Sequence, residues 1–298
     1  LPLGGGKGGV KVDPTKLSRT EKQNLTRRYT SELGTLIGPR VDIPAPDMGT
    51  DAQTMAWIMD TYSQEVGNSE PGVVTGKPIE IGGSLGRNGA TGLGVVFITE
   101  KALEKIGMKM SGITMVIQGF GNVGSHAALY AHQRGAKVIA VSDVSGGIHN
   151  PSGLNVPELL KYVAEHKVVR GFPGSEPISN DDLLTLKCDV LAPCAMENQI
   201  SETNAHKIQA KIITEGANGP TNNAATKILT ERDVMVCPDI LANGGGVIVS
   251  YFEWVQGMQQ FFWSENEVND RMKQIINGAF DKVWELKTEK KVDMRTAA

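Results

Sequence analysis

A glycine-rich turn between two apolar runs constrains this chain more than any other feature. An apolar run at Ile113–Ile117 precedes the turn, an amphipathic segment follows it as far as Arg134, and a second apolar run at Lys137–Val141 ends at Asp143. The turn matches the pattern G-x-G-x-x-G with the residues Gly119-Phe120-Gly121-Asn122-Val123-Gly124. Because the pattern lies between a strand and a helix, and a second strand follows, it predicts a dinucleotide site rather than a turn that binds nothing.

Each glycine of this pattern has a separate physical role. Gly119 permits the tight turn, Gly121 lets a pyrophosphate approach the backbone, and Gly124 lets the helix pack against the strand. The first turn of the helix then offers free N–H groups and its positive dipole end to the phosphates. Asp143 stands where the acid that binds the ribose is expected, and no Arg or Lys follows at positions 144–147. NAD is therefore preferred, and NADP stays open.

Short apolar runs alternate with helical segments over the rest of this region. We expect further strands at 190–192, 212–214 and 234–236, with helical stretches near 199–208 and 222–231. This alternation is typical of a parallel sheet covered by helices on both faces. Ligands bind at the carboxyl ends of such strands, where Asn218 follows one of the runs.

The amino-terminal part contains two candidate reactive side chains. Lys7 has glycines on both sides, which leave its amine open to a ligand, and a lysine in a dry site can polarise a carbonyl or act as a base. A solvated lysine in a flexible loop is the alternative on these residues alone. Asp47 follows the rigid segment Pro44-Ala45-Pro46, which favours a fixed side chain over an ordinary Asp near a helix start. A phosphate-binding P-loop is excluded around Lys7, because G-K-[ST] does not follow.

Composition excludes several classes of protein. The 30 Lys and Arg nearly balance the 33 Asp and Glu, so no basic face for nucleic acid is expected. The spacing of the 3 Cys and 5 His predicts no metal site and favours a reducing compartment, which we take to be the cytoplasm. No apolar run approaches the roughly 18 residues of a membrane helix. The first residue, Leu1, is not Met, and no helix-stop residue precedes Ala298. We therefore expect the chain to be a fragment of a longer protein.

Seven collinear motifs together resemble the glutamate dehydrogenase family, which also includes leucine, phenylalanine and valine dehydrogenases. They cover essentially the whole chain: LPLGGGKGG at 1–9, DIPAPDMGT at 42–50, GRNGATGLG at 86–94, QGFGNVG at 118–124, SDVSGGI at 142–148, ITEGANGPT at 213–221 and PDILANGGGVIVSYFEW at 238–254. The resemblance implies reversible oxidative deamination of L-glutamate to 2-oxoglutarate and ammonium. It makes Lys7 the residue that polarises the reacting carbon and activates water, and Asp47 the residue that shuttles protons.

The resemblance also implies the binding residues and the architecture. It assigns Ala45, Arg87, Val247 and Ser250 to the substrate, and it adds Thr91, Asn122, Asn218 and Asn243 to the dinucleotide site. It implies an α/β fold in which a Rossmann-like nucleotide domain at 76–245 and a partial α/β substrate domain at 1–75 flank a cleft. Residues 246–298 then form a helical return to the substrate domain, and the assembly is a homohexamer.

Two alternative functions remain open at this point. One is a leucine, valine or phenylalanine dehydrogenase, whose apolar pocket has no need of Ser250. The other is a non-catalytic regulatory subunit of glutamate dehydrogenase, since the family's two upstream substrate lysines precede Leu1. Ser250 and the run Lys7-Gly8-Gly9 argue against the first alternative, and retention of Lys7, Asp47 and Ser250 argues against the second.

Overall fold

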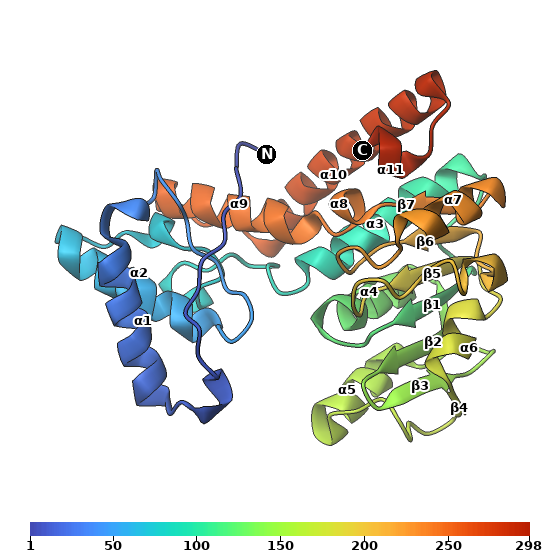
Figure 1. Cartoon of the computed structure of the whole chain (residues 1–298), viewed down its shortest axis with the longest axis horizontal. Coiled ribbons are helices and arrows are strands. Elements are labelled where there is room, and N and C mark those ends of the chain that lie inside the picture. Colours follow the sequence, from blue (N-terminus) through green and yellow to red (C-terminus); the bar gives the residue numbers. More distant parts are fainter. The chain divides into compact units, whose positions relative to one another are not determined.

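The computed structural model describes residues 1–298 and divides into two compact units (Figure 1). The first unit contains Leu1–Arg87 and Val247–Asp270, and the second contains Asn88–Gly246 and Arg271–Ala298. The sequence predicts domain boundaries after residues 75 and 245 and assigns residues 246–298 to a helical return to the substrate domain. In the structure Arg271–Ala298 group with the second unit, because Met272, Ile276 and Phe280 are buried there on one face of a helix.

The first unit is built from helices. They are η1 (Pro14–Lys16), α1 (Arg19–Leu33), η2 (Gly34–Leu36), α2 (Ala52–Val66), η3 (Pro71–Val73), η4 (Ile79–Ile81), most of α9 (Gly245–Gln259) and the start of α10 (Glu265–Lys290). A capping box formed by Ser18 and Glu21 begins α1. Buried side chains of α2 pack with Ile37, Val73 and Val74 in a small core.

Residues 40–43, whose sequence could form a short strand, do not form one. Only an isolated bridge joins Ile37 to Asp42. The backbone N–H of Val41 donates to Gly38 O, and that of Gly38 donates to Asp42 O. These hydrogen bonds close a tight local turn. The backbone N–H and C=O groups of the segment are therefore bonded within the turn and not to a neighbouring strand.

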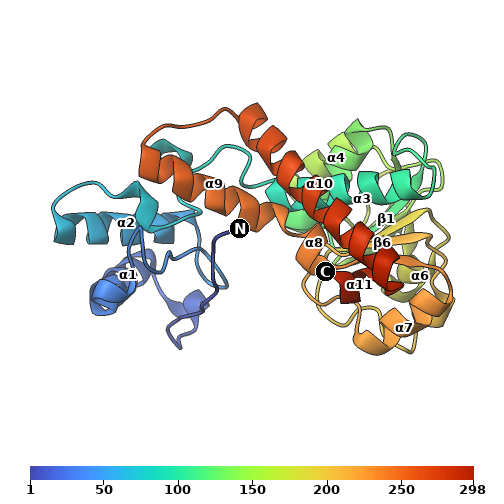
Figure 2. The same ribbon diagram turned by 90° about the horizontal axis from the view of Figure 1, so that it is seen from above.

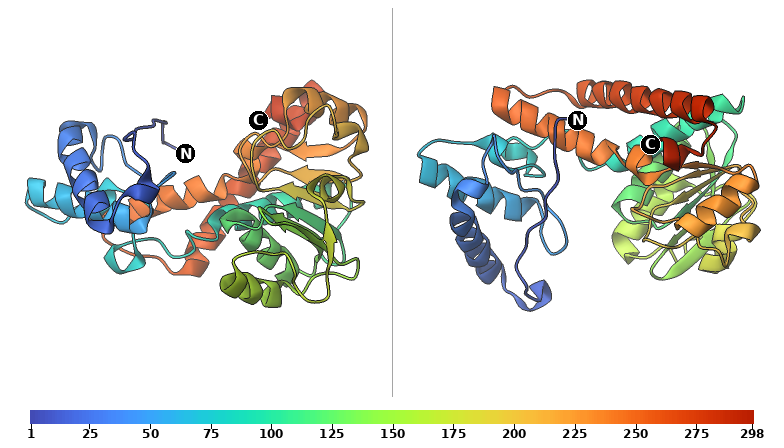
Figure 3. Two further views of the ribbon diagram at one scale, coloured as in Figure 1. Left: turned by 60° about the horizontal axis from the view of Figure 1, so that its bottom comes forward. Right: turned by 45° about the horizontal axis from the view of Figure 1, so that its top comes forward.

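The second unit contains one sheet of seven strands, drawn in green to orange in Figure 3. The strands are β1 (Thr114–Gln118), β2 (Lys137–Asp143), β3 (Gly146–His149), β4 (Glu176–Ile178), β5 (Val190–Pro193), β6 (Ile212–Thr214) and β7 (Met235–Cys237). Their order is β4-β3-β2-β1-β5-β6-β7. The five strands from β2 to β7 in this order run parallel, whereas β3 pairs antiparallel with both of its neighbours, β2 and β4. The predicted α/β fold is confirmed.

Helices cover both faces of this sheet (Figure 2). They are α3 (Ala90–Lys105), α4 (Asn122–Gln133), α5 (Val156–His166), α6 (Asn180–Thr185), η5 (Ala205–Lys207), α7 (Asn223–Glu231), α8 (Asp239–Ala242), the rest of α10 and α11 (Met294–Ala297). Successive side chains of a strand point to opposite faces. Accordingly, Val116 packs in the core with α6 and α7, while Ile117 lies against α4. No helix of the chain is long and apolar enough to cross a membrane.

The helix expected at 199–208 is wrong except for the short turn η5. The side chain of Asn204 accepts from the backbone N–H of Ser201 at 2.9 Å and donates to Gln199 O at 2.9 Å. An asparagine that bonds neighbouring backbone in this way competes with helical hydrogen bonds. Ile200 instead pairs with Thr221 in an isolated bridge.

Candidate functional site

The glycine-rich turn joins β1 to α4 at the centre of the sheet. β1 lies between β2 and β5, so the connections on its two sides run in opposite directions. Ligands of open parallel sheets bind at this switch point, outside the carboxyl ends of the strands. The register pairs Gln118 with Ser142, which brings Gly119 beside Asp143. The sequence-predicted turn and the predicted ribose acid are therefore neighbours.

The three glycines of the turn meet different surroundings. Gly119 has a φ of +89°, and a Cβ there would lie 2.9 Å from Ala195 N. A Cβ on Gly124 would lie 1.8 Å from Gly119 O, so only glycine lets α4 begin this close to β1. A Cβ on Gly121 would meet no atom within 4 Å. The fold does not require glycine at position 121, and the open space beside its backbone is what a pyrophosphate needs.

This contrast predicts opposite behaviour for two alanine variants. Gly121→Ala is expected to leave the thermal unfolding midpoint unchanged and to weaken NAD about tenfold, since the methyl group occupies space for the ligand. Gly124→Ala is expected to destabilise the second unit by about 1–3 kcal/mol through overpacking. Calorimetric titration with NAD and thermal denaturation measure the two effects. Unchanged NAD affinity in Gly121→Ala contradicts the assignment.

Asn122 begins α4 and contacts the segment before α3. Its Nδ2 donates to Asn88 O at 3.0 Å. α3 and α4 pack closely at Gly92, where a Cβ would lie 2.6 Å from Ala127 N. Thr91 precedes this glycine on α3. The structure thus places Thr91 and Asn122, both predicted to contact the cofactor, on two helices in direct contact.

Asn218 and Asn243 form a second predicted pair that the structure brings together. Asn218 follows β6, and Asn243 caps the end of α8. Asn243 Nδ2 donates to Asn218 Oδ1 at 2.6 Å. The remaining amide groups of the pair keep a donor and an acceptor for a ligand.

Asp143 ends β2 and is already engaged by nearby backbone. Its carboxylate accepts from Ser145 N at 2.7 Å and from Val169 N at 2.7 Å, and also from the Ser145 hydroxyl. A carboxylate has about four acceptor positions, so one remains for a ribose hydroxyl. These bonds fix the orientation of the side chain before any ligand binds.

In the first unit Lys7 and Asp47 form an ion pair. Lys7 Nζ donates to Asp47 Oδ2, and both side chains are exposed, by 85% and 60%. Asp47 Oδ1 also accepts from Met48 N at 2.8 Å. The hydrogen bond from Lys7 is the largest of the effects that hold the pKa of Asp47 below its usual value, followed by the Met48 N–H. The structure therefore pairs the two predicted catalytic residues and keeps Asp47 ionised.

The loop that carries Asp47 is braced from one side. Thr75 N donates to Pro44 O at 3.0 Å. Gly76 has a φ of +77°, and a Cβ there would lie 2.5 Å from Pro46 Cδ. Only glycine allows this close approach, which fixes the segment directly before Asp47.

A buried ion pair, which the sequence did not predict, holds the backbone of Gly76 in this position. Lys77 Nζ lies 2.7 Å from Glu253 Oε1, and both side chains are 0% exposed. Glu253 also accepts from Gly76 N at 3.0 Å and from Lys77 N at 3.3 Å. Burial lowers the pKa of Lys77, while Glu253 raises it. The available signal was a glutamate in the middle of the largely apolar helix α9, between Phe252 and Trp254.

Arg87 and Ser250, both predicted to serve the substrate, are hydrogen-bonded. Arg87 Nε donates to Ser250 Oγ at 2.9 Å. Burial lowers the pKa of Arg87, and Glu253 opposes this shift. Val247 lies one turn before Ser250 on α9 and is half exposed, and Ala45 is exposed in the Asp47 loop.

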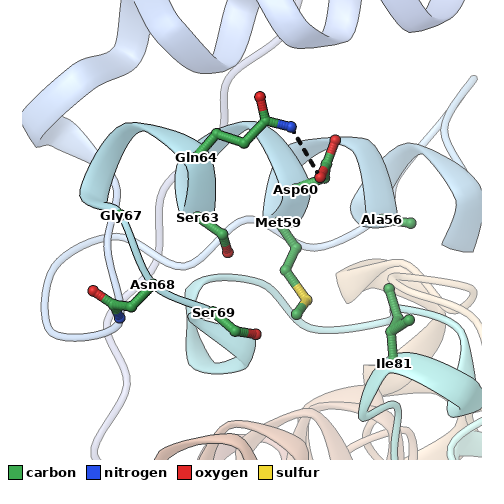
Figure 4. A pocket seen from close by; sticks show the side chains of 9 residues that line it. All are labelled: Ala56, Met59, Asp60, Ser63, Gln64, Gly67, Asn68, Ser69 and Ile81. Atoms are coloured by element: carbon green, nitrogen blue, oxygen red, sulfur yellow. Dashed lines mark hydrogen bonds between the residues drawn. The ribbon is translucent and has the colours of Figure 1, made fainter.

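A surface pocket of about 490 Å³ lies on the first unit, away from these residues (Figure 4). It is lined by Ala56, Met59, Asp60, Ser63, Gln64, Gly67, Asn68, Ser69 and Ile81. Gln64 donates to Asp60 across its rim at 3.1 Å. None of the predicted site residues contributes to it, so we assign it no part in the chemistry.

A dinucleotide turn at the switch point, together with a lysine–carboxylate pair, defines the class of nicotinamide-dependent oxidoreductases. Residues 82–298 match the family model described as Glutamate/Leucine/Phenylalanine/Valine dehydrogenase, and residues 1–64 match the dimerisation domain of these enzymes. The chain belongs to the Glu/Leu/Phe/Val dehydrogenase family.

Several relatives are similar over the whole chain. Glutamate dehydrogenase of Thermotoga maritima is 53% identical over 299 residues, which cover 100% of this chain and 72% of that protein. NAD-specific glutamate dehydrogenase of Staphylococcus aureus is 48% identical with the same coverage. Among solved structures, the Leu-bound hetero-hexameric glutamate dehydrogenase of Thermus thermophilus superposes with a TM-score of 0.89 at 40% identity, over 96% of this chain and 68% of that one.

Proposed function

We propose that this chain catalyses the NAD-dependent oxidative deamination of L-glutamate. One molecule each of L-glutamate, NAD⁺ and water gives 2-oxoglutarate, ammonium, NADH and one proton. The ion pair of Lys7 with Asp47 carries the proposal, because this reaction needs one group that polarises the reacting carbon and one that moves protons. Relatives of this chain are named glutamate dehydrogenases, and several of them are named NAD-specific.

The two residues of the pair have complementary tasks. Asp47, whose pKa is held low, accepts a proton from the substrate amino group as the imine forms. Lys7 then polarises the imine carbon and orients the water that attacks it. Bound NAD supplies the acceptor for the hydride that leaves Cα. The open backbone at Gly121 and the start of α4 fit its pyrophosphate.

The hydrogen bond between Arg87 and Ser250 favours a substrate with a side-chain carboxylate. Because Ser250 Oγ accepts from Arg87 Nε, its own hydroxyl hydrogen is free to donate elsewhere. A carboxylate uses such a donor, whereas the side chain of leucine or valine leaves it unpaired. We assign Ala45 and Val247 to the same substrate site and Thr91, Asn122, Asn218 and Asn243 to NAD.

A comparison of substrates tests the proposal. In the full-length protein with NAD, turnover of L-glutamate is expected to exceed that of L-leucine by about a thousandfold or more, since a site built for a polar group rejects the analogue without it. NADH formation measures both rates, and L-norvaline serves as an apolar control of similar length. Turnover of leucine without glutamate turnover overturns the assignment. Tight NAD binding without any turnover favours a regulatory subunit.

The nucleotide preference has its own test in Asp143→Ser. This change removes an acceptor for the ribose hydroxyl and a negative charge that repels a 2′-phosphate. We expect the affinity for NAD to fall about tenfold and that for NADP to fall less. Titration of both nucleotides gives the ratio, and an unchanged ratio shows that Asp143 is not the ribose acid.

We further propose that the first unit holds the substrate, that the second holds the dinucleotide, and that the protein is a cytoplasmic homohexamer. The three cysteines are free, which fits a reducing compartment. The hetero-hexameric assembly named for the Thermus thermophilus relative supports six subunits, and identical subunits are part of our proposal.

A further inference from the structure

Arg295, near the end of the chain, joins two carboxylates at the carboxyl edge of the sheet. It belongs to α11 in the second unit. Arg295 Nη2 donates to Glu215 Oε1 at 2.6 Å, and Nη1 lies 3.6 Å from Asp239 Oδ1. The side chain of Glu215 is 0% exposed and follows β6, while Asp239 begins α8. One guanidinium therefore compensates two acidic groups, one of which is fully buried.

These two carboxylates also tie together the segments that carry the paired asparagines. Glu215 Oε2 accepts from Asp239 N at 2.9 Å, which fixes the start of α8. Asp239 Oδ2 accepts from Gly219 N at 2.7 Å, directly after Asn218. At the other end of α8, Asn243 donates to Asn218. A closed ring of contacts, which includes the guanidinium of Arg295, therefore sets the position of the side-chain amides of Asn218 and Asn243, here called the amide pair.

We propose that Arg295 is a positioning residue for the dinucleotide site, acting through Glu215 and Asp239 on the amide pair of Asn218 and Asn243. The inference rests on the proposed function, which assigns this amide pair to NAD. Arg295 itself need not touch the ligand, because its contacts in the structure are the two carboxylates.

The energetics explain why a cation is needed here. Burial raises the pKa of Glu215, and the charge of Arg295 is the largest effect that opposes the rise. Without Arg295, a buried carboxylate faces a second acid with no compensating charge. The segment after β6 then has to open to water, or Glu215 has to take up a proton, and either change releases the amide pair.

Arg295→Met tests the inference in the full-length protein. It preserves most of the side-chain volume and removes both contacts. We expect the Kd and the KM for NAD to rise about tenfold, as when a charge-assisted contact is lost, with the KM for glutamate changed less than about twofold. Arg295→Lys keeps the charge but cannot reach both carboxylates as a fork, so about a threefold rise is expected.

Arg232→Met is the matched control. Arg232 is another arginine of the second unit, more exposed than Arg295, and its guanidinium donates to Ala205 O and Ile208 O, away from the amide pair. We expect it to lower the unfolding midpoint and to leave the Kd for NAD within about twofold, since distant sites act independently. Equal loss of NAD affinity in this control shows that Arg295 acts only on stability and overturns the inference.

The outcomes separate the inference from the proposed function. If the wild-type protein does not bind NAD, the proposed function fails. If the wild type binds NAD and Arg295→Met binds it equally well, the inference alone fails. Should Arg295→Met not fold, Arg295→Lys decides, and an unchanged Kd in that variant overturns the inference.

Discussion

Lys7→Ala is expected to lower glutamate turnover by at least about a thousandfold while NAD still binds with nearly wild-type affinity. The variant removes the charge that polarises the reacting carbon, and it leaves the Asp47 carboxylate without its partner. The glycine-rich turn belongs to the other compact unit and keeps its contacts. Steady-state formation of NADH and calorimetric titration with NAD measure the two quantities separately.

Lys11→Ala provides the control, because Lys11 is an exposed lysine in the same amino-terminal segment. Its kcat should stay within about twofold of wild type, as for a surface substitution away from specific contacts. The pKa of Asp47 should also rise toward its ordinary value in Lys7→Ala, because the largest cause of its lowering is lost. Near-normal turnover in Lys7→Ala shows that Lys7 takes no part in the chemistry.

The second large effect is expected on stability in Lys77→Met. The change leaves the Glu253 carboxylate fully buried without a cation, at a cost of about 3–5 kcal/mol. Since Glu253 also holds Gly76, and Gly76 packs on Pro46, the Asp47 loop should loosen as well. Urea denaturation measures the loss of stability, and kcat for glutamate reports on the loop.

A double variant separates charge burial from simple loss of packing. Lys77→Met combined with Glu253→Gln removes the uncompensated charge and keeps an oxygen acceptor for Gly76 N, so we expect it to recover about half of the loss. Lys161→Met, which breaks the exposed pair with Glu158, should cost less than about 0.5 kcal/mol. A double variant as unstable as the single one contradicts the role given to the buried charge.

The parallel part of the sheet could be predicted because its strands are short apolar runs with clear breaks. The antiparallel edge could not. β3 begins with two glycines, and β4 has only three residues with Pro177 at its centre, so neither has the alternation of a half-buried strand. β3 pairs with β2, and β4 pairs with β3, and no local pattern encodes these contacts.

The residues of the site divide in the same way into those that a local sequence pattern predicts and those that only the fold reveals. Residues that chemistry requires at fixed spacing, such as Gly119 and Asp143, stand out in the sequence. Lys77 with Glu253 and Arg295 with Glu215 are separated by 176 and 80 positions. A charged residue gives no local signal of its partner, so supports of this kind become visible only when the fold brings them together.

The short strand β4 has a consequence for how copies of this chain can assemble. Pro177 at its centre lacks an N–H, so an added strand would find no donor there. At the opposite edge, α11 packs against β7, which has three residues. Both borders of the sheet thus discourage growth by backbone pairing. Copies of this chain that associate are therefore expected to do so through side chains rather than by extending this sheet, which guards against open-ended growth into fibres.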